Sequence, residues 1–61
     1  MKDSFDMFMT VVKKLAGSQG LYSRMLNQIN SMTEDELDNL REQLNQVTFK
    51  DEIDVIMFVE C

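Results

Sequence analysis

The sequence predicts an all-α protein, a bundle of three to four short helices. Apolar residues recur every three to four positions through most of the chain, proline is absent, and both glycines fall within one break at residues 17–20. A chain of 61 residues lies near the lower limit of domain size, so we expect a single small helical domain over residues 1–61. The predicted helices cover about residues 4–16, 19–30, 34–45 and 52–60.

The first predicted helix, over residues 4–16, has an apolar surface wider than one packed side requires. Its main apolar face consists of Phe5, Phe8, Met9, Val12, Leu15 and Ala16. Met7 and Val11 extend this face, which makes both of them candidates for a contact with another protein. Gly17 is expected to end the helix in the left-handed conformation, because glycine has no Cβ to oppose it.

The second predicted helix, over residues 19–30, has Ser18 as its expected N-cap. Its apolar seam repeats every four residues, at Leu21, Met25 and Ile29. Tyr22 and Arg24 belong to the residue types enriched at protein interfaces, so both are candidate contact residues. The simpler interpretation, which the pattern favours, half-buries Tyr22 with its hydroxyl in water and leaves Arg24 facing solvent.

The third predicted helix, over residues 34–45, has the clearest start in the chain. Thr33 and Glu36 have the spacing of a capping box, in which each side chain accepts a hydrogen bond from the other's backbone N–H. Three acidic residues occupy the first turn, where the helix dipole favours negative charge. Leu37, Leu40 and Leu44 form a narrow seam, which predicts that one side packs and the other is solvated.

The last segment fits either a helix or a strand. Six of the seven residues from 53 to 59 are apolar and several are β-branched, which suits a strand. A single strand in an otherwise helical chain, however, has no partner for its backbone groups. Asp51 as N-cap with Asp54 at the third helical position favours a helix over residues 52–60, and we predict a helix.

The periodicity of this last helix suggests two apolar stripes. Ile53, Ile56 and Met57 are expected to face the core, and Val55 and Val59 to form a second stripe at the surface. One short helix cannot bury both stripes against three others of similar length. The candidate protein-binding residues are therefore Met7, Val11, Tyr22, Arg24, Val55 and Val59.

The residue types of this chain argue against a catalytic site, a metal site and a disulfide. The chain has no histidine and one cysteine, Cys61, so we expect no disulfide, no metal site, no cofactor and no catalytic activity. Glu34, Asp38 and Glu42 share one helix ridge, which could hold a cation or dock a partner. A solvated helix face is the favoured interpretation, because no calcium-binding loop is present and one ridge cannot surround an ion.

The net charge and the lengths of the apolar runs limit the partners and the cellular location that we expect for this protein. The net charge of −5 opposes binding to the phosphate backbone of nucleic acid. A DNA-reading helix-turn-helix is equally disfavoured, because its recognition helix would begin with Glu34, Asp35 and Glu36. No apolar run approaches the length of a membrane span and no leader pattern is present, so we expect a cytoplasmic protein that binds no membrane.

The most informative feature is a surplus of apolar residues, including six methionines. Methionine-rich surfaces adapt to partners, and exposed apolar patches mark contact sites. Three functions remain open: a module that binds another protein, a self-associating module that forms a homodimer, and an acidic inhibitor that imitates nucleic acid. The low density of carboxylates argues against the third.

Three stretches resemble a group of small accessory open reading frames of phages and conjugative elements of Gram-positive bacteria. They are SQGLYSRML at residues 18–26, EDEL at residues 34–37 and FKDEIDVIMFVE at residues 49–60. The resemblance covers residues 18–60, about two-thirds of the chain, with Ser23 where those proteins have glycine. It implies an accessory or anti-host role, acting on a host or defence factor, and transfers no catalytic residue.

Overall fold

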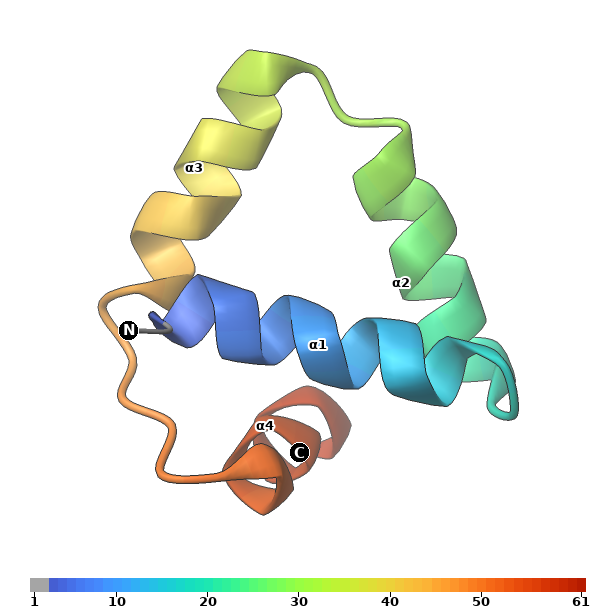
Figure 1. Cartoon of the computed structure of the whole chain (residues 1–61). Coiled ribbons are helices and arrows are strands. Elements are labelled where there is room, and N and C mark those ends of the chain that lie inside the picture. The colour runs from blue at the N-terminus through green and yellow to red at the C-terminus, as the bar shows by residue number, and fades with distance from the viewer. Residues whose placement is uncertain (1–2) are drawn as a thin grey trace.

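Residues 3–61, which the computed structural model describes, form four α-helices joined by short loops (Figure 1). The helices are α1 (Ser4–Ala16), α2 (Gly20–Asn30), α3 (Glu34–Leu44) and α4 (Glu52–Glu60). This confirms the predicted all-α fold, with each helix end within one residue of its predicted position. It also confirms that the last segment is a helix, as the Asp51 cap suggested.

Helix α1 is the centre of the arrangement. It contacts each of the other three helices, whereas contacts among those three are few. Helices α2 and α3 form the other two sides of a triangle whose base is α1 and whose apex is the turn at residues 31–33 (Figure 1). In the same view α4 lies on the other side of α1 and is seen almost end-on. The α3–α4 loop, residues 45–51, connects α3 with α4 on the opposite side of α1.

The core forms where α1 meets its three neighbours. The buried side chains are those of Phe5, Phe8, Val11, Val12, Tyr22, Ile29, Leu44, Phe49 and Val55. Four of them belong to α1, because a helix enclosed from three sides buries a wide arc of its surface. Val11 is only 1% exposed, so its predicted place at a contact surface is wrong. The wide apolar arc of α1 serves three intramolecular partners.

Side-chain caps start three of the four helices. Thr33 Oγ1 accepts from the Glu36 backbone N–H at 3.2 Å, and Glu36 Oε1 accepts from the Thr33 backbone N–H at 2.9 Å, which confirms the capping box. Asp51 caps α4 through the backbone N–H of Asp54 at 3.1 Å, also as predicted. Asp3 caps α1 in the same way, a cap that its position three residues before Asp6 could have indicated.

The turn between α1 and α2 differs from its prediction in two respects. Gly17 has a right-handed φ of −73°, not the left-handed conformation. Ser18 is not the N-cap of α2; that position belongs to Gln19, whose side chain makes no capping hydrogen bond. The reason is a tight right-handed turn, in which the backbone N–H groups of residues 17, 18 and 19 all donate to the carbonyl of Leu15. No left-handed residue is needed to end α1.

Thr33→Ala is expected to lower the free energy of unfolding by about 1 kcal/mol, because it removes the acceptor for the Glu36 backbone N–H. In a domain of this size that corresponds to a decrease in Tm of roughly 4–8 °C, measurable in a reversible circular-dichroism melt. Thr33→Ser keeps the hydroxyl and is the matched control, with a smaller decrease expected. Equal Tm values for the wild type and Thr33→Ala would contradict the role of the cap.

Candidate protein-binding surface

Helix α4 is rotated relative to its predicted orientation. Val55 is fully buried, whereas Ile53 is 64% exposed and Met57 is 60% exposed. The sequence-based assignment of Ile53 and Met57 to the core and of Val55 to the surface is therefore wrong. The cause is that α4 is apolar on almost every side, so its own pattern cannot specify which side packs. Packing against α1 decides it.

Three side-chain contacts join α4 to other parts of the chain. The Glu52 carboxylate forms an ion pair with Lys14 Nζ at 3.1 Å, but both side chains are largely exposed, so this pair contributes little. The Phe58 ring meets the Phe49 ring edge-to-face, with 5.5 Å between ring centres and 77° between planes. The Tyr22 hydroxyl donates to Glu60 Oε2 at 2.9 Å and so joins α2 to α4.

Tyr22 is a core residue and not an exposed contact residue. Its side chain is fully buried, so both its predicted contact role and the predicted half-burial are wrong. The hydroxyl lies at the edge of the core, where the exposed Glu60 reaches it. Burial, followed by the hydrogen bond and the negative charge of Glu60, raises the pKa of the Tyr22 hydroxyl above its ordinary value.

Tyr22→Phe is expected to lower the free energy of unfolding by an amount that depends on pH. Near neutral pH the variant loses one hydrogen bond, which should lower the free energy of unfolding by about 1 kcal/mol. The pKa of Tyr22 is higher in the folded protein, so as the pH rises above about 10 the unfolded chain releases this proton first. The stability that depends on the protonated hydroxyl is complete below that pH and is lost above it.

Urea unfolding of the wild type and Tyr22→Phe between about pH 7 and pH 11 measures this effect. The difference in stability between the two proteins should shrink across the upper part of that range. Lysine titration affects both proteins equally and cancels in the comparison. Tyr22 is the only tyrosine, so tyrosinate absorbance follows this one group directly. A difference that is independent of pH would contradict the raised pKa.

An apolar groove lies between α2 and α3, with side chains of α1 and α4 completing it. It has a volume of about 390 Å³. Seven apolar side chains and Gln43 line it, namely Phe8, Leu21, Met25, Leu40, Leu44, Phe58, Val59 and Gln43. Leu21 and Phe58 are 43% and 49% exposed, so the groove is open to solvent. We call it the α2–α3 groove.

The remaining predicted contact residues occupy different places. Val59 is half-buried and lines the α2–α3 groove. Arg24 is exposed on α2, the helix that supplies Leu21 and Met25 to the groove. Met7 is half-buried at a separate hollow near the start of α1. The structure thus places Val59 and Arg24 on helices that border the groove, and Met7 away from it.

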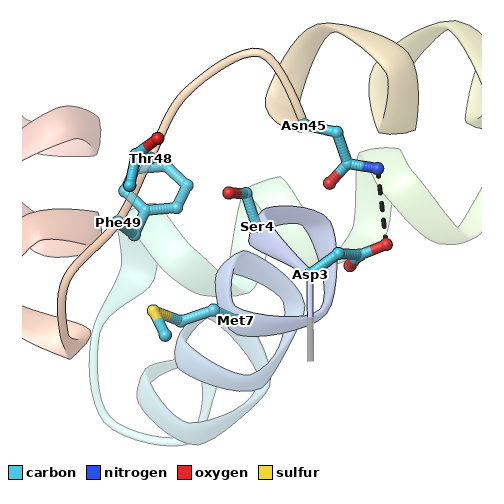
Figure 2. A pocket seen from close by; sticks show the side chains of 6 residues that line it. All are labelled: Asp3, Ser4, Met7, Asn45, Thr48 and Phe49. Carbon is cyan, nitrogen blue, oxygen red and sulfur yellow. Dashed lines mark hydrogen bonds between the residues drawn. The ribbon is translucent and has the colours of Figure 1, made fainter. Parts of the chain in front are cut away.

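The hollow beside Met7 is the junction between α1 and the α3–α4 loop (Figure 2). Asn45 Nδ2 donates to Asp3 Oδ2 at 3.3 Å, and Asn45 Oδ1 accepts from the Phe5 backbone N–H at 3.0 Å. The Ser4 hydroxyl donates to the Val47 carbonyl. These polar groups are hydrogen-bonded to one another, so they fasten the start of α1 to the α3–α4 loop.

Among residues 3–61, three large apolar side chains that the sequence assigned to the core are exposed. They are Leu21, Ile53 and Met57, and Phe58 joins them. Periodicity could not find them, because it predicts which residues share a face and not whether a neighbour covers that face. The only signal was the surplus of apolar residues, which the sequence located on other side chains.

The acidic ridge of α3 has the features of a solvated face. Glu34, Asp38 and Glu42 are all exposed. Among residues 3–61, no group of three or more histidine, cysteine, aspartate or glutamate side chains is arranged to hold a metal ion. Within the same residues, none of the helices has the length and apolar character to cross a membrane.

Comparisons with known protein families, with curated proteins and with solved structures found no match for this chain.

Proposed function

We propose that the chain is a non-enzymatic protein-binding module whose α2–α3 groove accepts an amphipathic helix of another protein. The observation that carries this proposal is the groove itself. Its lining is apolar, and Leu21 and Phe58 remain about half exposed at its edge. Helix-in-groove binding uses a surface of this kind, with apolar side chains at helical spacing as anchors.

The shape of the fold supports a helical occupant. Helices α2 and α3 diverge from their turn toward the two ends of α1 (Figure 1). Leu21 and Met25 come from one wall and Leu40 and Leu44 from the other, and each pair has helical i, i+4 spacing. A helix laid between two such walls meets a row of apolar side chains on each side.

Charge indicates that the occupant carries basic residues beside its apolar face. The chain has a net charge of −5. Glu60 adjoins Val59 at one part of the groove, and Glu36 lines a second hollow where α2 and α3 converge. Positive side chains on the incoming helix would be attracted to these carboxylates and to the overall field.

The resemblance to accessory proteins of phages and conjugative elements supports a role on a host or defence factor. A small protein without catalytic groups acts on such a factor by occupying one of its surfaces. This biological role is part of the proposal and follows from the resemblance, not from the groove.

Two designed peptides test the groove directly: an amphipathic helix of leucine and lysine, and the same sequence with glutamate in place of each lysine. We expect the lysine peptide to bind with a Kd in the micromolar range by titration calorimetry and the glutamate peptide not to bind. Binding should weaken as salt rises, because charge attraction contributes. Equal binding of both peptides would contradict the predicted charge preference.

Matched variants distinguish the groove from general attraction to an acidic protein. Leu21→Ser removes a groove side chain without changing the charge, and should weaken the lysine peptide at least about tenfold. Ile53→Ser removes a more exposed apolar side chain that lies outside the groove, and should leave binding unchanged. Peptide binding that is unaffected by Leu21→Ser would overturn the proposal.

A further inference from the structure

Helix α4 has a second apolar face that the α2–α3 groove does not use. Six of its nine residues are apolar, yet only Val55 is buried. Ile53 and Met57, spaced i, i+4, form an outward ridge with exposed fractions of 64% and 60%. A helix that is apolar on all sides is normally enclosed on all sides. In this structure α1 is its main neighbour, so the ridge lacks a cover.

The acidic side chains of α4 are held by the chain's own groups. Glu52 is paired with Lys14 at 3.1 Å, and Glu60 accepts from the Tyr22 hydroxyl at 2.9 Å. Asp54 Oδ2 accepts from the Lys50 backbone N–H at 2.8 Å. Each of these carboxylates already has a partner within the chain. A second molecule that approaches the ridge therefore does not have to desolvate a carboxylate without a partner, even though the chain as a whole is acidic.

A hollow of about 400 Å³ lies beside the ridge. Four positions on α4 and at its C-cap border it, at the i, i+3, i+4 and i+7 spacing of a knobs-into-holes socket: Asp54, Met57, Phe58 and Cys61. Residues 47–49 of the α3–α4 loop form the opposite wall. The surface thus has a projection and a depression side by side on one helix.

We propose that this face binds a second copy of the chain, with the two α4 helices antiparallel and Ile53 of each copy in the hollow of the other. A two-fold interface joins a patch to itself, so it requires a projection and a matching depression on the same surface. The ridge and the hollow meet this requirement without any other partner.

The charges at the two ends of α4 favour the antiparallel direction. Lys50 is exposed just before the helix begins, and Glu60 is exposed where it ends. Antiparallel pairing brings Lys50 of one copy toward Glu60 of the other, and places the positive N-terminal end of one helix dipole beside the negative C-terminal end of the other. Parallel pairing would place like ends together.

The size of the face sets the expected strength. A helix of nine residues is about 14 Å long, and the loop walls add little, so each copy buries less than the ~800 Å² of a standard interface. We therefore expect a reversible dimer with a Kd in the micromolar range. This face shares Phe58 with the α2–α3 groove, but Leu21 and Leu40 of the groove lie outside it.

Sedimentation equilibrium of the full chain between about 5 and 500 μM tests the dimer. The wild type should shift with concentration from 7.1 kDa toward twice that mass. Ile53→Asp should stay monomeric, and Leu21→Asp, an equal charge on another exposed apolar residue, should dimerise as the wild type does. Circular dichroism melts establish that each variant is folded. A wild type that is monomeric throughout, or an Ile53→Asp protein that still dimerises, would overturn the proposal.

An added thiol tests the antiparallel geometry. Residues 53 and 61 are eight positions apart along a helix, about 12 Å, which is too far for a disulfide within one chain. Oxidised Ile53→Cys should therefore form covalent dimers in which the introduced thiol of one copy is joined to Cys61 of the other, as identified by peptide mass spectrometry. Dimers joined only through Cys61 and Cys61 would exclude the antiparallel arrangement.

Discussion

Val55→Asp should unfold the protein. Val55 of α4 is fully buried in the core against α1. The variant therefore places a carboxylate in an apolar site without a partner. An uncompensated buried charge costs about 3–5 kcal/mol, to which the lost valine contacts add. A chain of this length has a total stability of roughly 3–9 kcal/mol, so most or all of it is consumed. Far-UV circular dichroism should show loss of helix and of a cooperative melt.

Ile53→Asp is the matched control for this prediction, because it introduces the same side chain two residues away at an exposed position. Exposed substitutions usually change the free energy of unfolding by no more than about 0.5 kcal/mol, so this variant should melt close to the wild type. The pair discriminates between the two possible rotations of α4. If Ile53→Asp unfolded and Val55→Asp did not, the orientation expected from periodicity would be the correct one.

Tyr22→Ala is expected to have the second largest effect. Tyr22 is the largest of the fully buried side chains, and its ring and hydroxyl together connect α2 with the core and with Glu60 on α4. Replacing a buried aromatic ring with alanine leaves a cavity and costs about 3–5 kcal/mol. The variant should be largely unfolded, or should unfold at a much lower urea concentration than the wild type.

Tyr22→Phe separates the ring from the hydroxyl in this experiment. It keeps the packing and loses only the hydrogen bond, so its midpoint in urea should fall far less than that of Tyr22→Ala. If Tyr22→Ala were no more costly than Tyr22→Phe, the ring would not be part of the core, and an exposed contact role for Tyr22 would be restored.

Local signals accounted for the helices. Thr33 with Glu36, and Asp51 with Asp54, start α3 and α4 through hydrogen bonds within one turn, so adjacent residues contain all the information required. The single glycine break placed the end of α1 and the start of α2 within one residue. Two local predictions were wrong: Gly17 ends α1 as expected but in a right-handed conformation, and the N-cap of α2 is Gln19 and not Ser18.

The candidate surfaces could not be located in this way. The residue type of Tyr22 made it a candidate contact residue and its position favoured half-burial, but its full burial depends on which helix lies opposite it. Ile53 and Val55 are both apolar residues of one short helix, and no residue near them in sequence distinguishes their environments. Their exposures of 64% and 0% arise from the position of α4 against α1.

The sequence by itself therefore determined the fold class, the helix boundaries to within one residue and the caps of α3 and α4, because hydrogen bonds and periodicity within a few residues encode them. The tertiary structure alone decided which apolar residues are core and which are surface. Helix α4 has apolar side chains on almost every side, so any of several rotations would bury a similar area, and contacts with residues far away in the sequence select one of them. That selection buries Val55 and exposes Ile53 and Met57, on which the proposed dimer depends, and Phe58, which borders both the α2–α3 groove and the hollow beside the ridge.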